Sequence, residues 1–162
     1  MPDAWGEGEG ELAGFLPYQL SVTSNAVSSL IAERYRKRFG LKIPEWRVMA
    51  VLGDSGSLTQ RALTAATVMD KVAVNRAVKV LEERGLIGRV PNPDDGRSHL
   101  LALTAEGRAI HGEVMPLARA TERELLGGLA PEEEVQLRAL LATLRAKATA
   151  LAVQMRKGPE PG

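Results

Sequence analysis

Residues 58–87 read LTQRALTAATVMDKVAVNRAVKVLEERGLI, and this stretch decides the fold. It contains two helical patterns that are separated by a short turn. Thr59 and Asp70 each stand directly before one pattern, where a side-chain oxygen can accept an unpaired backbone N–H. The sequence therefore predicts one helix over 60–67 and a second helix over 71–84, joined as a helix-turn-helix.

The second of these helices has two unlike faces. At about 100° per residue, four apolar side chains fall on one face, which we expect to pack into the core. These four are Val74, Ala77, Val78 and Leu81. The opposite face carries Val72, Asn75, Arg76, Lys79 and Glu83. Asn, Arg and Lys reach base edges or phosphates, and a valine methyl can contact a thymine methyl, so this face indicates DNA contact. A merely solvated polar face is the alternative interpretation.

A hairpin is expected directly after the second helix. The pattern predicts strands over 86–90 and 98–103, joined by a loop rich in Pro, Asp and Asn. Arg97 lies at the tip of this hairpin, from which an arginine can enter the narrow, electronegative minor groove. Asp95 can orient that guanidinium by bidentate pairing, or it can only rigidify the turn. Together with the two helices, the hairpin describes a winged helix-turn-helix.

Longer helical patterns lie on both sides of this motif. Helices are predicted over 17–39, 44–53 and 105–126, the last of these capped by Thr104, and a final helix begins at Pro131. The terminal helices carry apolar residues that one chain cannot easily cover. These residues are Leu12, Phe15, Leu16 and Leu20 near one end and the stripe from Leu137 to Leu151 near the other. Interleaving across a two-fold axis would bury both sets, which predicts a homodimer; an ordinary bundle within one chain is the alternative.

The composition is that of an ordinary globular protein. The 162 residues include 44% hydrophobic and 25% charged residues, which fits one domain or one domain with an extension. No apolar run approaches the roughly 18 to 20 residues of a membrane span, so no membrane partner is expected. The absence of Cys excludes disulfides, Cys-based zinc sites and a cysteine-oxidation switch, and it favours a cytoplasmic location.

The charge is unevenly distributed along the chain. Lys and Arg number 21 against 20 Asp and Glu, and this balance alone argues mildly against a nucleic-acid partner. Residues 1–11, however, contain four acidic and no basic residues and are rich in Gly, which predicts a disordered acidic tail. The other residues carry 21 basic against 16 acidic groups and therefore form a basic body.

An enzyme is the main competing class of protein. His99 and His111 are the only histidines, and neither has the spacing of a nucleophilic or metal site. The sequence has no glycine-rich phosphate loop, so we expect no catalytic residues, no metal and no cofactor. A second alternative is a winged-helix protein-interaction module without DNA binding, which the Arg97 wing and the polar helix face disfavour.

Residues 41–104 resemble the MarR family of bacterial transcriptional regulators. Three stretches carry the resemblance: IPEWRVMAVLG, the helix-turn-helix stretch quoted above, and the wing PNPDDGRSHLLALT. The Asp-x-Arg-Ser wing followed by Leu-x-Leu-Thr is the most specific part, and with the flanking helices the similarity spans about 15–151. The resemblance implies a mostly α fold, namely a winged helix-turn-helix with a two-stranded β wing and a helical dimerisation region. It also implies a homodimer that binds pseudo-palindromic, double-stranded operator DNA.

Position by position, the resemblance implies a set of DNA-contacting residues. They are Lys71, Val72, Asn75, Arg76 and Lys79 on the recognition helix and Arg97 on the wing. The sequence departs from the family pattern at a few positions. Val68 stands where a turn Gly is frequent and predicts strain in a left-handed conformation, Val72 and Ala73 replace Ser or Thr hydroxyls, and Gly96 replaces a second wing Arg.

The resemblance further implies control by a small molecule. Many relatives respond to phenolic or other aromatic compounds in a pocket between the dimer helices and the DNA-binding lobe. The candidate pocket residues are Phe15, Tyr18, Trp46, Arg47 and His111. Core positions for Phe15 and Trp46 and a surface position for His111 are the alternative interpretation.

The expected organisation follows from these assignments. It comprises an acidic tail (1–11), an N-terminal dimerisation helix (12–40), a winged helix-turn-helix domain (41–104), C-terminal dimerisation helices (105–155) and a flexible tail (156–162). The expected function is that of a sequence-specific transcriptional regulator, a homodimeric repressor that a small-molecule effector releases from DNA.

Overall fold

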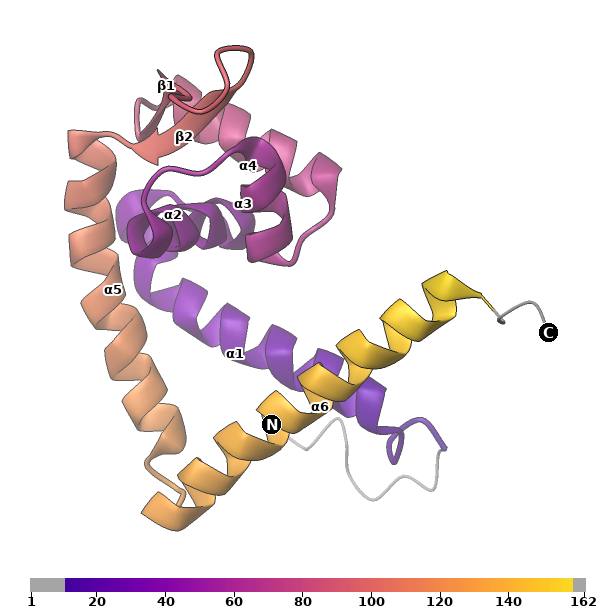
Figure 1. The fold of residues 1–162 in the computed structure, drawn as a ribbon. Helices are drawn as coiled ribbons and strands as arrows, with labels where there is room; N and C mark the ends of the chain where they lie inside the picture. The colour runs from indigo at the N-terminus through magenta and orange to yellow at the C-terminus, as the bar shows by residue number, and fades with distance from the viewer. Residues whose placement is uncertain (1–10, 159–162) are drawn as a thin grey trace. The chain divides into compact units, whose positions relative to one another are not determined.

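The computed structural model describes residues 11–158 (Figure 1). In chain order these residues form α1 (Leu16–Phe39), α2 (Ile43–Ser55), α3 (Gln60–Thr67), α4 (Lys71–Glu83), β1 (Ile87–Pro91), β2 (His99–Leu103), α5 (Ala105–Leu126) and α6 (Pro131–Lys157). The chain divides into one compact unit that ends at Thr121 and a second that begins at Glu122. No helix within the described range is long and apolar enough to span a membrane. The predicted tails lie largely outside this range, although residues 156 and 157 are helical.

Side-chain caps define the helix-turn-helix as predicted. Thr59 Oγ1 accepts the backbone N–H of Ala62 at 3.1 Å, and Asp70 Oδ1 accepts that of Ala73 at 2.8 Å. Each bond satisfies one of the unpaired donors at a helix start. α3 therefore has its predicted bounds, and α4 ends one residue earlier than predicted.

α2 is longer than the sequence pattern predicts. The Glu45 carboxylate accepts the backbone N–H of Lys42 at 2.9 Å, which starts the helix at Ile43. At the other end, the helix continues through Gly53, its predicted last residue, to Ser55. A Cβ on Gly53 would lie 2.2 Å from Nε2 of His111, so this glycine makes room for the imidazole and does not end the helix.

The core of the first unit lies where α2, α3, α4 and the hairpin meet (Figure 1). The four apolar residues on the predicted inner face of α4 are all buried, with at most 3% exposure. They are Val74, Ala77, Val78 and Leu81. The two strands pair antiparallel, with Ile87 opposite Leu103, and Leu101 exchanges two backbone hydrogen bonds with Leu58. The wing is therefore attached directly to the segment that precedes α3.

Thr104 joins the wing to α5. Its Oγ1 donates to the Gly85 carbonyl at 2.7 Å and accepts the backbone N–H of Gly107 at 3.1 Å, as expected of a helix cap. Its backbone N–H donates to the Leu86 carbonyl at 3.1 Å. A Cβ on Gly107 would lie 2.0 Å from that same carbonyl oxygen. The first turn of α5 thus packs against the start of the hairpin without space for a larger residue.

The second unit contains the end of α5 and the whole of α6. Arg138 forms ion pairs with Glu122 at 2.9 Å and with Glu134 at 2.7 Å. None of the described residues of α6 is buried, although the helix is 27 residues long. Three of its leucines, Leu140, Leu141 and Leu144, are 42–55% exposed.

Candidate nucleic-acid interface

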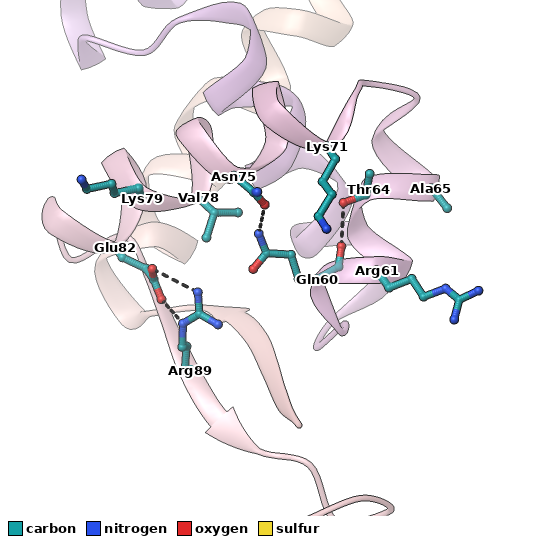
Figure 2. Close-up of a pocket in the computed structure, with 10 residues that line it drawn as sticks. All are labelled: Gln60, Arg61, Thr64, Ala65, Lys71, Asn75, Val78, Lys79, Glu82 and Arg89. Carbon is teal, nitrogen blue, oxygen red and sulfur yellow. Dashed lines mark hydrogen bonds and ion pairs between the residues drawn. The ribbon is translucent and has the colours of Figure 1, made fainter. Parts of the chain in front are cut away.

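The exposed faces of α3 and α4 form a broad concave surface with β1. It encloses about 1000 Å³, and its lining residues include three basic residues of the two helices, Arg61, Lys71 and Lys79 (Figure 2). The other lining residues are Gln60, Thr64, Ala65, Asn75, Val78, Glu82 and Arg89. Three of the lining residues, Lys71, Asn75 and Lys79, are among the DNA contacts predicted from the sequence. The contributions of α3 and β1 were missed.

The predicted outer face of α4 is exposed along its whole length. Val72, Asn75, Arg76, Lys79 and Glu83 all face solvent, and Val72 is 64% exposed. Among residues 11–158, no ion pair involves Lys71, Arg76 or Lys79. Within that range these cations therefore have no anionic partner, which is the state that an anionic ligand requires.

Two amide side chains meet inside the concavity. The Gln60 Nε2 donates a hydrogen bond to Asn75 Oδ1, which joins the first residue of α3 to the outer face of α4 (Figure 2). The Thr64 hydroxyl donates to the Gln60 carbonyl at 2.8 Å. The orientation of the Asn75 amide is thus set by a residue of the neighbouring helix.

A salt bridge lies at the β1 side of the same surface. Arg89 Nε is 2.6 Å from Glu82 Oε1, and a second, longer contact of 3.4 Å joins Arg89 Nη2 to Glu82 Oε2 (Figure 2). Both side chains remain partly exposed. The pair ties the last turn of α4 to the first strand of the wing, and it neutralises the Arg89 charge.

The loop between β1 and β2 is braced by its own side chains. The Asn92 amide donates to Ser98 Oγ at 2.9 Å. Asp95 Oδ1 accepts the backbone N–H of Arg97 at 3.0 Å. No ion pair within residues 11–158 joins the Asp95 carboxylate to the exposed Arg97 guanidinium. Asp95 therefore acts on the backbone of the wing and rigidifies the turn, and the bidentate pairing considered from the sequence is not formed.

The turn between α3 and α4 contains a strained residue. Val68 has φ of 54° and ψ of 38°, and it is the only non-Gly residue with positive φ in the part of the chain that the structure describes. Left-handed backbone is unfavourable for a β-branched residue, so the predicted strain is present. Val68 is also 87% exposed, so no packing of its own side chain offsets the cost.

The five predicted pocket residues do not come together. Phe15 and Tyr18 lie at the start of α1, where Phe15 is exposed and Tyr18 borders a separate small pocket. Trp46 and Arg47 line a cavity of about 180 Å³ between α1 and α2, which Tyr35 also lines. The sequence predicts a common pocket, but Ser28, the first residue of α1 that lines this cavity, lies ten residues after Tyr18, which is roughly 15 Å along the helix.

His111 belongs with the second of these groups. Its ring centroid lies 5.6 Å from that of Trp46, which in turn lies 5.7 Å from that of Tyr35. Burial lowers the pKa of His111 below its ordinary value of 6.5, although the charge of Asp54 opposes the shift. Burial raises the pKa of Tyr35 to about 12. Both rings are therefore neutral near pH 7. No group of three or more potential metal ligands occurs within residues 11–158.

Comparisons with known proteins match this chain to transcriptional regulators. A family model described as MarR family matches residues 39–98. The chain is 34% identical over 91 residues to the transcriptional regulator HosA of Escherichia coli O111:H-. These 91 residues cover 56% of this chain and 67% of HosA. It is 26% identical over 132 residues to the HTH-type transcriptional repressor Rv2887 of Mycobacterium tuberculosis, covering 81% and 91% of the two chains.

Two solved structures are also similar to this chain. A mutant of MarR from E. coli in complex with operator DNA matches with a TM-score of 0.71 and 25% identity, covering 80% of this chain and 92% of that chain. BpsR of Bordetella bronchiseptica matches with a TM-score of 0.74 and 25% identity, covering 85% and 98%, and its DNA binding is regulated by 6-hydroxynicotinic acid. Because HosA is 34% identical over 67% of its own length, and because the winged fold agrees, this chain belongs to the MarR family of transcriptional regulators.

Proposed function

We propose that this chain is a homodimeric repressor that places α4 in the major groove of pseudo-palindromic operator DNA and Arg97 in the adjacent minor groove. The two-faced character of α4 carries the proposal. One face is buried in the core, and the other presents Lys71, Asn75, Arg76 and Lys79 to solvent. An α-helix with such a polar face fits the roughly 12 Å width of the major groove.

The exposed residues divide into two chemical roles. Lys71 and Lys79, with Arg61 on α3, supply positive charge that neutralises phosphates and fixes the register of the helix. Asn75 and Arg76 have the hydrogen-bonding groups that read base edges. Val72 offers a methyl surface to a thymine methyl.

The dimer is supported by the exposed apolar surface of the terminal helices. α6 buries no described side chain within its own chain, and a long helix gains most of its stability from packing an apolar face. α1 likewise exposes Leu16, Leu20 and Leu30. A second copy would cover these residues and would set two recognition helices about 34 Å apart, one turn of DNA. The regions 12–40 and 105–155 would then form the dimerisation part.

The effector is proposed to bind the cavity beside Trp46 and Arg47. This cavity of about 180 Å³ is small for a ligand site, so it suits a compound of one ring. Trp46 and Tyr35 supply aromatic walls, and the Arg47 guanidinium suits a carboxylate. An aromatic acid is therefore the proposed class of effector, in agreement with the 6-hydroxynicotinic acid that regulates BpsR.

A titration of DNA binding against salt tests the proposed function. The probe is the intergenic DNA upstream of the chain's own gene, and binding is expected to weaken steeply as salt rises because phosphate contacts release counterions. Arg97→Ala is expected to lower affinity about ten-fold or more, while Arg119→Ala on α5 serves as a matched control. Salt-insensitive or absent binding would instead favour a protein-interaction module. Equal effects of the two substitutions would exclude the role of the wing.

The effector has a separate test. Addition of 6-hydroxynicotinic acid or benzoic acid is expected to release the DNA, and phenol, which lacks a carboxylate, is expected to act more weakly. Arg47→Gln is expected to remove this difference between acids and phenol, since the substitution deletes the charged partner. Release that is unchanged in Arg47→Gln would exclude this cavity as the site of acid binding.

A further inference from the structure

We infer that Gln60 on α3 is a specificity-determining residue of the DNA-binding surface, because its amide sets which hydrogen-bonding groups Asn75 presents to a base. The inference rests on the proposed DNA-binding function and goes beyond it by adding a residue of α3 to the sequence readout. It also states the chemistry of the base edge that is preferred.

The geometry places the two amides in direct contact. Gln60 Nε2 donates to Asn75 Oδ1 on the concave surface, whose lining residues also include Lys71, Lys79 and Arg61 (Figure 2). The backbone of Gln60 is held in turn, because Gln60 is the first residue of a capped helix and its carbonyl accepts the Thr64 hydroxyl at 2.8 Å. The Gln60 side chain therefore starts from a fixed position.

The direction of this hydrogen bond decides what Asn75 offers. A free Asn amide can turn by half a rotation and present either its oxygen or its NH₂ group. With Oδ1 directed to Gln60, the Nδ2–H donors of Asn75 are left for DNA. Donors require acceptors on the base edge, which are N7 and O6 of guanine, N7 of adenine and O4 of thymine. Cytosine offers only its N4–H₂ donor in the major groove, so it is the disfavoured base at this position.

The hydrogen bond between Gln60 and Asn75 becomes energetically important only when DNA covers it. In water an amide pair adds little net stability, because water competes for both groups. Between the protein and a base, water is excluded, and every buried donor or acceptor must then be paired. Base preference in the complex is therefore the sensitive readout, whereas the stability of the free protein is not.

The experiment measures base preference directly. The wild-type protein selects a site from a library of randomised duplexes, and each position of that site is then changed to every base pair and titrated. Gln60→Ala and Asn75→Ala are expected to relax preference at the same base pair, each by about ten-fold. The double variant is expected to show no further loss, since the two residues act as one unit.

Gln60→Glu tests the direction of the hydrogen bond. A carboxylate only accepts, so Asn75 must donate its Nδ2–H to it and turn Oδ1 toward the base. Preference at this base pair is then expected to shift toward cytosine or adenine, which present an N–H donor. Arg61→Gln is the matched control, because it makes the same change in charge at the next residue. It is expected to weaken binding uniformly and to reduce the salt slope by about one, without a change in base preference.

The outcomes are distinguishable. An unchanged base profile in Gln60→Ala, or a profile that changes at a different base pair from Asn75→Ala, overturns the inference and leaves the proposed function intact. A profile that Asn75→Ala does not alter also overturns the inference. Failure of the wild-type protein to select any site overturns both. Thermal unfolding of each variant establishes that it folds, which is expected because neither amide belongs to the core.

Discussion

α4 and α6 use similar residue types in opposite ways. α4 has 13 residues, and its Val74, Ala77, Val78 and Leu81 are buried by its own chain, which leaves a polar face for a ligand. α6 has 27 residues, and its leucines remain exposed. The comparison teaches that apolar periodicity predicts which face of a helix is covered but does not identify what covers it. For α4 the cover is intramolecular, and for α6 we propose a second copy.

The largest expected effect comes from placing a charge on α6. Leu140→Glu puts a carboxylate into the proposed dimer surface, where burying it without a partner is costly. We expect a dimer-to-monomer shift by analytical ultracentrifugation. DNA affinity should fall about 100-fold or more, because two linked half-sites become one. Gln136→Glu makes the same charge change at an exposed polar position and should leave the dimer intact. A dimeric Leu140→Glu protein would refute this part of the comparison.

The two faces of α4 can be separated by one substitution on each. Leu81→Ala removes a fully buried side chain, and we expect the free energy of unfolding to fall by about 2–5 kcal/mol. Arg76→Ala on the exposed face should change stability by no more than about 0.5 kcal/mol while it alters base preference. Denaturant unfolding and DNA titration measure both quantities for each protein. Similar stability losses in the two variants would contradict the assignment of the faces.

A smaller effect of opposite sign is expected in the turn before α4. Val68→Gly relieves a left-handed valine, and no packing is lost because the side chain is 87% exposed. We expect stability to rise by up to about 1 kcal/mol, since the greater entropy of unfolded glycine offsets part of the relief. Chemical denaturation provides the measurement, with Val72→Gly as the control. That control should lose a few tenths of a kcal/mol, because its residue has ordinary helical backbone and glycine is a poorer helix former than valine. A loss of stability in Val68→Gly would show that Val68 is not strained.

The smallest expected effect is a pH dependence at His111. Burial lowers its pKa in the folded protein below 6.5, so the unfolded chain binds the proton more readily. The stability contributed by the neutral ring is therefore complete above about pH 6.5 and declines as the pH falls through that value. The free energy of unfolding of the wild type and of His111→Gln is measured at about pH 7.5 and at about pH 5.5. The difference in this free energy between the two proteins should be smaller at the lower pH. A constant difference would show that the ring does not couple folding to protonation.

Local signals made most of the fold predictable. Thr59, Asp70 and Thr104 each precede a helix, and each side chain forms the cap that its type and position predict. The wheel of α4 likewise separated the buried face from the exposed face. The end of α2 was misplaced, because a glycine commonly ends a helix and Gly53 instead accommodates a ring from α5. That contact joins residues far apart in the sequence, so no local pattern contains it.

The candidate site was predictable only in part, for the same reason. The exposed residues of α4 followed from its periodicity. Gln60 and Arg89 did not, because each takes its place on the surface through a partner on another element, Asn75 or Glu82. The proposed pocket residues were chosen by chemical type, and type alone did not separate Tyr18 at the start of α1 from Trp46 on α2.

The junction at Thr104 has a mechanical consequence. One residue holds the end of the recognition helix, the start of the wing and the first turn of α5 through three hydrogen bonds. The backbone at Gly107 also packs closely against the Leu86 carbonyl, because a Cβ added to Gly107 would collide with it. A tilt of α5 would therefore move the wing with it, because the two elements are joined tightly at this point. Since the His111 ring lies against Trp46 about two turns along α5 from this junction, a ligand that displaces that ring acts on α5 close to the wing.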